Sequence, residues 1–468
     1  MNSATFTSTD VIRASFSTAM SAMYRTEVPA YGTLLELVAQ VNDDTLAASP
    51  KLRHRLELTE TLDRISEERH GAIRVGTPAE LAMLRRAFAV MGMYPVGYYD
   101  LSEAGVPVHS TAFRPVGDEA LKINPFRVFT SLLRLDLIDD GKLREEARKT
   151  LDARRIFTDK AILLIEKAEA AGGLDAADAA LFVKEILETF RWHDKASVSS
   201  DLYRRLHDAH RLIADVVSFK GPHINHLTPR TLDIDAVQKL MPAHGIAPKA
   251  VIEGPPTREC PILLRQTSFK ALEEAVSFRD AEGTWAKGSH TARFGEIEQR
   301  GVALTPKGRA LYDRLLAQAR EVVRPAPDGS NAAAYIAALS EAFKAFPDDW
   351  NTIRQQGLGY FRYTPVEGFP RAALSTREPA SLETLVAMGA VVFDPIVYED
   401  FLPVSAAGIF QSNLGDNGAQ KFAASPSQQE FEAHLGMPVL DEFAHYEGLE
   451  KASIARCRRY LQPVALVD

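Results

Sequence analysis

The stretch Arg69-His70-Gly71-Ala72-Ile73-Arg74 is echoed in the second half of the chain by Asn225-His226-Leu227-Thr228-Pro229-Arg230. In each stretch an arginine follows the histidine by four residues, and a helix-capping residue, Thr77 or Asp233, follows it by seven. Roughly 25 residues past each histidine, a Pro-containing turn leads into an apolar stretch. This register predicts two copies of a strand–helix–strand unit, each contributing one histidine from the same place. A metal site between paired modules needs such an arrangement.

The composition favours a globular protein with more than one structural unit, because 468 residues exceed one typical domain. The net charge of −8 and the scattered lysines and arginines argue against a nucleic-acid partner. The apolar runs are too short to span a membrane, and the N-terminus carries no secretory pattern. The two cysteines, Cys260 and Cys457, fit a reducing cytoplasm and leave histidine and carboxylate as metal ligands.

Apolar periodicity predicts an α+β fold in five segments. They are N-terminal helices over 1–60, a first βαβββ-like module over 61–138, a helical insertion over 139–215, a second βαβββ-like module over 216–326 and a mixed C-terminal region over 327–468. Within the second module, Val216–Phe219 and Thr291–Gln299 are predicted to be strands.

Two histidines, His223 and His226, compete for the second metal position. Gly221-Pro222 and Pro229 disfavour a helix here, and in an extended segment a separation of three residues sends the two rings to opposite faces. The register with His70 selects His226.

A third ligand is offered by the predicted strand that carries Glu296 and Glu298, which alternate onto one face. Two carboxylates on an otherwise apolar strand are costly to bury without a cation. Two histidines and one carboxylate form the facial arrangement of non-haem Fe(II) enzymes, although Zn(II) can occupy the same ligands. Opposite a metal, Arg74 is placed to clamp a carboxylate bidentately. Its alternative is a surface cation paired with Glu67 or Glu68.

At these residues the sequence resembles known enzymes. Glu296–Gly301 is similar to the last metal-bearing strand of 4-hydroxyphenylpyruvate dioxygenase, and that alignment makes Glu296 the ligand and puts Glu298 at an aliphatic position. Over nearly the whole chain, the sequence resembles the 2-oxoadipate dioxygenase/decarboxylase (hydroxyglutarate synthase) family of the vicinal oxygen chelate superfamily. The segments that carry this resemblance are Glu68–Arg74, Met93–Asp100, Gly221–Arg230 and Phe294–Gly301.

The resemblance implies paired βαβββ modules of vicinal oxygen chelate type, with large helical insertions and a helical N-terminus. It implies Fe(II) held by His70, His226 and Glu296, with Arg74 as the catalytic residue that binds the distal carboxylate of the substrate. It also suggests Val404 and Ser405, and more weakly Gln266, as substrate-binding residues. The implied reaction converts 2-oxoadipate and O2 to 2-hydroxyglutarate and CO2 in cytoplasmic lysine degradation.

Two other functions stay open at this point. A glyoxalase-type metal lyase or isomerase acting on a small 2-oxo acid would keep the fold and work without O2. A non-catalytic small-molecule binding protein would reuse the paired-module cavity, and its ligand affinity would not depend on His70 or Glu296.

Overall fold

The computed structural model describes residues 6–59, 62, 65, 68–279, 284–326, 328–370, 380–402 and 426–461. The chain forms two compact units. The first comprises Met1–Glu253, Gln266–Gln299 and Phe401–Leu440, and the second comprises Gly254–Arg265, Arg300–Asp400 and Asp441–Asp468. The five-segment division from the sequence stays a prediction.

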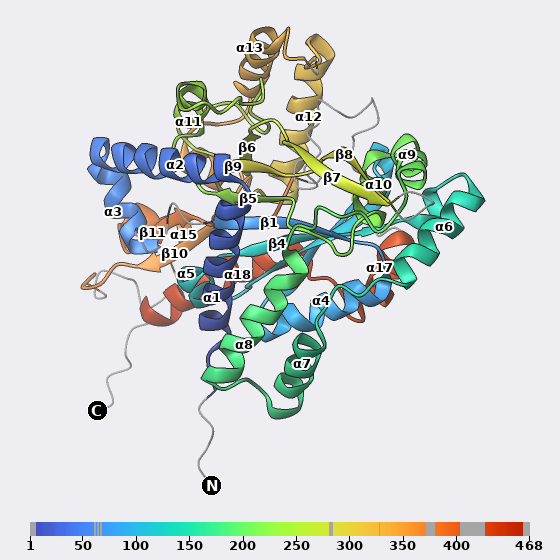
Figure 1. The fold of residues 1–468 in the computed structure, drawn as a ribbon. Helices are drawn as coiled ribbons and strands as arrows, with labels where there is room; N and C mark the ends of the chain where they lie inside the picture. Colours follow the sequence, from blue (N-terminus) through green and yellow to red (C-terminus); the bar gives the residue numbers. More distant parts are fainter. Residues whose placement is uncertain are drawn as a thin grey trace. The chain divides into compact units, whose positions relative to one another are not determined.

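The first unit is built on a seven-stranded sheet of order β2-β3-β4-β1-β5-β9-β6 (Figure 1). Its strands are β1 Glu68–Val75, β2 Tyr94–Asp100, β3 Val108–Arg114, β4 Arg127–Leu133, β5 His226–Pro229, β6 Leu264–Ser268 and β9 Phe294–Arg300. In the middle of the sheet, β1 pairs parallel to β4 and antiparallel to β5, and β5 pairs parallel to β9. The α+β class predicted from the sequence is confirmed.

The first half of this sheet has the chain order β1-α4-β2-β3-β4, with α4 at Pro78–Val90. This helix begins where the sequence predicts, because Thr77 Oγ1 accepts a hydrogen bond from the Glu80 backbone N–H and the Glu80 side chain accepts one from the Thr77 backbone N–H. The strand–helix unit therefore rests on local capping as well as on burial.

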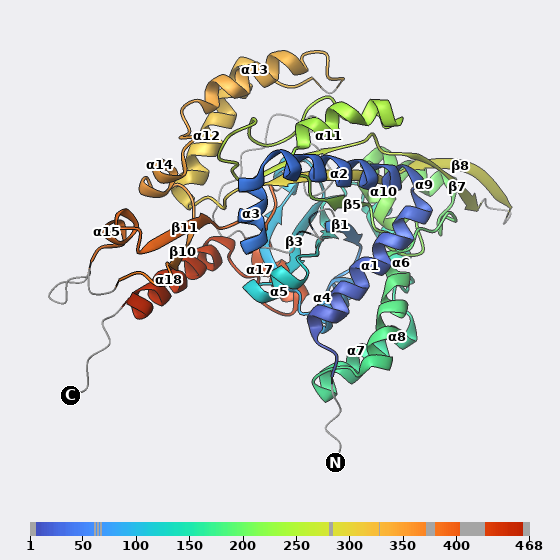
Figure 2. The ribbon, with the colours of Figure 1, turned by 90° about the vertical axis from the view of Figure 1, so that its left-hand side faces the viewer.

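The helices described in the first unit are α1 Thr9–Glu27, α2 Pro29–Ala48, α3 Pro50–Thr59, α4, α5 Asp118–Ile123, α6 Gly141–Asp152, α7 Asp159–Ala171, α8 Ala176–Leu187, α9 Ser200–Ala209, α10 Arg211–Val217, α11 Ile234–Leu240 and α17 Pro426–Leu435. Among them, α1, α2, α4 and α8 pack against one face of the sheet. Figure 1 and Figure 2 show α1, α4 and α8 together on this side.

The face turned to these helices is apolar. Side chains that it buries among those of α1, α2, α4 and α8 are Ile73, Val75, Val128, Leu132, Leu227 and Ile297. Because successive side chains of a strand point to opposite faces, His70 and Arg74 of β1, His226 of β5 and Glu296 of β9 share the other face. The packing that stabilises the fold thus also decides the side of the sheet on which the polar residues lie.

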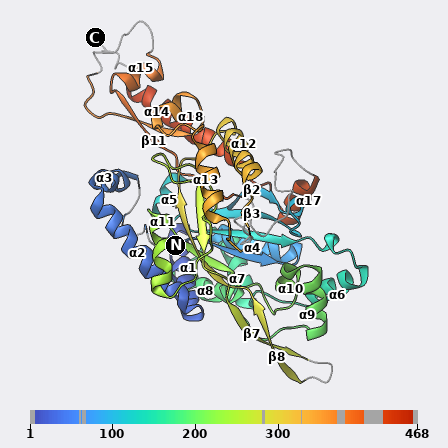
Figure 3. The ribbon, with the colours of Figure 1, turned by 90° about the horizontal axis from the view of Figure 1, so that it is seen from above.

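The second half of the sheet departs from the predicted module. Strands β7 Glu273–Arg279 and β8 Trp285–Thr291 pair with each other outside the seven-stranded sheet, so Thr291 ends β8 and β9 starts at Phe294. Figure 3 shows this hairpin beside α9 and α10.

The prediction of a strand at Val216–Phe219 was wrong, because Val216 and Val217 end helix α10 and Phe219 makes only an isolated bridge to Ala196. All of Leu212–Val217 is buried, and a short apolar run buried on all sides does not distinguish a helix from a strand.

The second unit contains a two-stranded antiparallel sheet of β10 Phe361–Pro365 and β11 Val391–Pro395. Its helices are α12 Pro306–Val322, α13 Ala332–Phe343, α14 Trp350–Gln355, α15 Leu382–Ala387 and α18 Glu442–Leu461. Helix α12 packs on α13, and α18 packs on β10. Among the helices of the described ranges, none is long and apolar enough to cross a membrane.

Candidate metal centre

Three potential metal ligands meet on adjacent strands of the first unit: His70 on β1, His226 on β5 and Glu296 on β9. One ligand atom of each lies within 4.8 Å of those of the other two, and all three side chains are fully buried. His70 Nε2 lies 3.1 Å from Glu296 Oε1. Two neighbouring ligands that each stand about 2.1 Å from a metal are separated by about 3 Å, so this spacing suits a shared ion.

Strand register brings these residues together. Thr228 stands opposite His70 on β1, and its hydroxyl lies 3.2 Å from both His70 Nε2 and Glu296 Oε1. His226 is two residues before Thr228 on the same face of β5, so its ring lies beside this pair. Gly71 leaves room for two apolar side chains over β1, because a Cβ at this position would lie 2.7 Å from the side chain of Ile224 and 2.9 Å from that of Leu227.

The two carboxylates of β9 take different positions around His70. Glu298 Oε2 lies 2.8 Å from His70 Nδ1, whereas Glu296 faces Nε2. A histidine that binds a metal through one nitrogen usually gives its other N–H to a carboxylate or carbonyl. The geometry therefore favours Glu296 as the ligand and Glu298 as the partner that orients His70.

Two side chains orient Glu296. Gln266 Nε2 donates a hydrogen bond of 2.6 Å to Glu296 Oε1, and Thr228 Oγ1 donates one of 3.2 Å to the same oxygen. The sequence suggested Gln266 for the substrate pocket, and the structure places its amide on the carboxylate. Thr228 was missed, although it follows His226 by two residues and a strand puts such positions on one face.

The donor set fits a divalent metal. Among the described residues, neither ring nitrogen of His226 nor Glu296 Oε2 has a hydrogen-bond partner. Burial lowers the pKa of His226 well below its usual value, and the charges of His70 and Arg74 lower it further, so the ring is held in the neutral form that metals bind. Glu296 and Glu298 are both fully buried, and a single imidazolium at His70 would leave one negative charge for a cation to balance.

Aromatic rings enclose the centre. The ring of Phe294 stacks on His226 with centroids 4.8 Å apart, and the ring of Phe401 meets His70 edge-on at 4.8 Å. Phe401 also contacts Phe129 at 5.2 Å. An apolar surround lowers the local dielectric and strengthens each charge interaction inside it.

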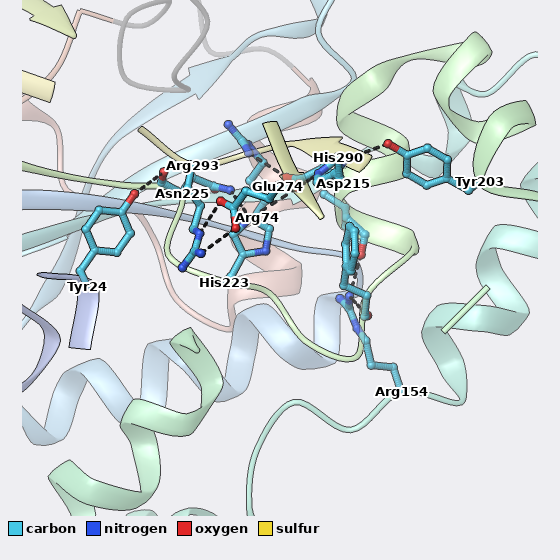
Figure 4. Close-up of polar contacts among 12 residues, drawn as sticks. Tyr24, Arg74, Arg154, Tyr203, Asp215, His223, Asn225, Glu274, His290 and Arg293 are labelled. Carbon is cyan, nitrogen blue, oxygen red and sulfur yellow. Dashed lines mark hydrogen bonds and ion pairs between the residues drawn. The ribbon is translucent and has the colours of Figure 1, made fainter. Parts of the chain in front are cut away.

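Arg74 lies on the same face of β1 as His70. Its Nη1 is 2.8 Å from Asp215 Oδ2, and Asp215 Oδ1 is 2.9 Å from His290 Nε2 and 3.5 Å from His223 Nε2 (Figure 4). Burial raises the pKa of Asp215, but His223, His290 and Arg74 outweigh it and hold that pKa well below the usual range. His223 thus faces Asp215, while His226 joins the metal-ligand group.

Buried hydroxyls adjoin Arg74 across the sheet. Ser131 of β4 pairs with Arg74, Ser110 of β3 pairs with Ser131, and the two serine oxygens lie 2.7 Å apart. These polar residues share the face of Arg74, and the sequence offered no signal for them beyond strand alternation. Val404 and Ser405, expected in the pocket, lie outside the described residues.

The chain is similar to known proteins along nearly its whole length. A family model described as 2-oxoadipate dioxygenase/decarboxylase matches residues 16–413. A 2-oxoadipate dioxygenase/decarboxylase of Pseudomonas putida is 59% identical over 456 residues, which cover 97% of this chain and 98% of the relative. The Escherichia coli protein of the same description is 57% identical over 450 residues, which cover 96% and 98%. The crystal structure of the Pseudomonas putida hydroxyglutarate synthase in complex with 2-oxoadipate matches with a TM-score of 0.90 at 59% identity, covering 98% of this chain and 99% of that chain.

Proposed function

Because this chain belongs to the 2-oxoadipate dioxygenase/decarboxylase family, we propose that it is an Fe(II) enzyme that converts 2-oxoadipate and O2 to 2-hydroxyglutarate and CO2. The observation that carries the proposal is the buried group of His70, His226 and Glu296, with Arg74 on the same face of β1. Both oxygen atoms of O2 and all six carbons of the substrate are then accounted for in the two products.

His70, His226 and Glu296 would hold the iron. Bound there, Fe(II) would supply the binding of a chelating 2-oxo acid and the activation of O2, as in other enzymes with two histidines and one carboxylate. Glu298 Oε2 lies 2.8 Å from His70 Nδ1, so a proton on Nδ1 would face the carboxylate and would leave the Nε2 lone pair for the metal. Gln266 and Thr228 hold Oε1 of Glu296, and the rings of Phe294 and Phe401 exclude water.

Arg74 would bind the distal carboxylate of the substrate. A guanidinium offers five N–H donors in a planar fork, so it can hold a substrate carboxylate while Nη1 stays on Asp215. Because Arg74 and His70 extend from the same face of one rigid strand, both ends of the dicarboxylate are positioned by a single element. Val404 and Ser405 stay in the proposal as further substrate-binding residues.

The fold supports this assignment through its first half, where β1-α4-β2-β3-β4 has the chain order of a βαβββ module. We propose that the second half is a modified copy, which begins at β5 with His226 and contributes β9 with Glu296. The paired modules would then be of the vicinal oxygen chelate type.

Oxygen-electrode measurements on the Fe(II)-loaded protein test the proposal. We expect O2 uptake with 2-oxoadipate, release of one CO2 per O2, and much lower rates with 2-oxoglutarate and 4-hydroxyphenylpyruvate. Absence of O2 uptake with all three acids would overturn the proposal, and product formation under nitrogen would instead indicate the glyoxalase-type lyase or isomerase.

A further inference from the structure

A surface cavity of about 430 Å3 is lined by residues of helices α9 and α10 and of the β7–β8 hairpin. The lining residues that matter here are Tyr203, Arg204, His207, Arg211, Lys287 and His290. The volume falls within the range of about 300–1,000 Å3 that is typical of small-molecule sites.

The cavity is basic in a chain whose net charge is −8. Arg204, His207, Arg211 and Lys287 are exposed around it, and none of its described lining residues carries a carboxylate. Arg204 lies 3.8 Å from Asp201, and both side chains are largely exposed, so this pair is weak. Such a concentration of positive charge attracts small anions and raises their local concentration.

The floor of the cavity is connected to Arg74. Tyr203 Oη lies 2.8 Å from His290 Nδ1, His290 Nε2 lies 2.9 Å from Asp215 Oδ1, and Asp215 Oδ2 lies 2.8 Å from Arg74 Nη1 (Figure 4). His290 and Asp215 are buried, whereas Tyr203 is half-buried at the cavity. Three consecutive polar contacts therefore lead from the surface cavity to the arginine proposed to bind substrate.

Positive charge continues inward from the cavity. Burial lowers the pKa of Arg74, the carboxylate of Asp215 opposes this shift, and the charge of Arg211 adds to it. Burial also lowers the pKa of Lys249 to about 8, while the carboxylates of Glu253 and Glu296 oppose this shift and Arg211 adds to it. Arg211 thus acts on both Arg74 and Lys249.

Arg74 is less deeply buried than the three proposed metal ligands. The Arg74 side chain keeps 11% of its surface exposed, whereas His70, His226 and Glu296 keep none.

We infer that the basic cavity is an outer binding site for a small dicarboxylate, which is held there before it reaches Arg74 and the metal centre. The identity of that dicarboxylate as 2-oxoadipate rests on the proposed function. The cavity itself is defined by its charge, its size and its contact with the Arg74 network.

Titration with adipate tests this site, because adipate has two carboxylates and no 2-oxo group to chelate a metal. Isothermal titration calorimetry on the metal-loaded full-length protein at low ionic strength should detect two dicarboxylate sites. Arg74→Ala should remove the inner site and keep the outer one. Lys287→Glu in the Arg74→Ala background should weaken the remaining site about tenfold or more.

Lys239→Glu in the same Arg74→Ala background is the matched control, since Lys239 is an exposed lysine of α11 outside the cavity and its reversal should leave adipate binding unchanged. Lys287→Gln, which removes the charge without reversing it, should give a smaller loss than Lys287→Glu and guards against a folding defect. Hexanoate, with a single carboxylate, should bind at least tenfold more weakly than adipate.

A kinetic measurement adds a second readout. Lys287→Glu should lower kcat/KM for 2-oxoadipate about tenfold at low ionic strength, and the deficit should shrink as salt screens the field. Loss of all adipate binding in Arg74→Ala, an unchanged outer site in Lys287→Glu, or equal binding of phosphate and adipate would overturn the inference. Absence of O2 uptake by the wild-type protein would refute the proposed function. The adipate titration requires no turnover, so it tests dicarboxylate binding in the cavity independently of the proposed function.

Discussion

Glu298 provides the sharpest test of how the metal centre is built. Its carboxylate is fully buried and lies 2.8 Å from His70 Nδ1. Removing a carboxylate that orients a metal-binding histidine typically costs 10–100-fold in metal affinity, or about 1.4–2.7 kcal/mol. Glu298→Gln keeps an acceptor oxygen for Nδ1–H and loses the charge, so we expect a loss near tenfold. Glu298→Ala loses both, so we expect a loss near 100-fold.

Competition with a chromophoric chelator measures these affinities, with Fe(II) under nitrogen and with Co(II) as a spectroscopic substitute. Glu296→Gln, which removes a proposed ligand, should lose more affinity than either Glu298 variant. Glu273→Gln, at an exposed carboxylate of β7, should bind like wild type. Affinities of both Glu298 variants within about twofold of wild type would refute the orienting role, provided that thermal unfolding shows folded proteins.

Three further predictions concern β1 and the residues in contact with it. Arg74→Ala should raise KM for 2-oxoadipate about 10–100-fold, because a hydrogen bond to a charged group contributes about 1.5–3 kcal/mol. The same variant should show a smaller preference for 2-oxoadipate over shorter acids, and wild-type kinetics would contradict both expectations. Asp215→Asn should lower the free energy of unfolding by about 3–5 kcal/mol at neutral pH. The pKa of Asp215 is lower in the folded protein than in the unfolded chain, so the Asp215 carboxylate stabilises the fold at pH values above its unfolded pKa of about 4. This stabilisation is lost as the pH falls toward the folded pKa. The difference in melting temperature between wild type and Asp215→Asn should therefore become smaller in acid. Gly71→Ala should lower the free energy of unfolding in chemical denaturation by about 1–3 kcal/mol, because its Cβ meets the side chains of Ile224 and Leu227. An unchanged midpoint would show that these two side chains can move aside.

Local signals made part of the fold predictable. Thr77 caps α4 and Asp233 caps α11, as the sequence predicts. The repeated register also indicated His226 rather than His223. Thr77 follows His70 by seven residues and Asp233 follows His226 by seven, and both helix caps are recognisable from nearby residues alone. Where the determining contacts are within one turn of a helix, the sequence was sufficient.

Long-range contacts decided the rest. Arg74 has its partner Asp215 at a separation of 141 residues, on helix α10, whose last turn was mistaken for a strand. The hairpin β7–β8 was missed because its outer residues are exposed and show weak alternation. The division of roles between Glu296 and Glu298 depends on which nitrogen of His70 each one meets, and strand alternation places both on the same face without distinguishing them.

Because His70 and Arg74 lie on one strand, the distance between them can change only in steps of two residues if both stay on the same face of β1. Four residues of extended chain span about 13 Å, and the next position on the same face lies about 6.7 Å away. One additional methylene group lengthens a dicarboxylate by much less than this step. Moving the arginine to the next position on the same face would therefore not match a substrate that is one methylene longer or shorter. We therefore expect a change in chain-length preference to come from the side chains that line the pocket, with His70 and Arg74 retained.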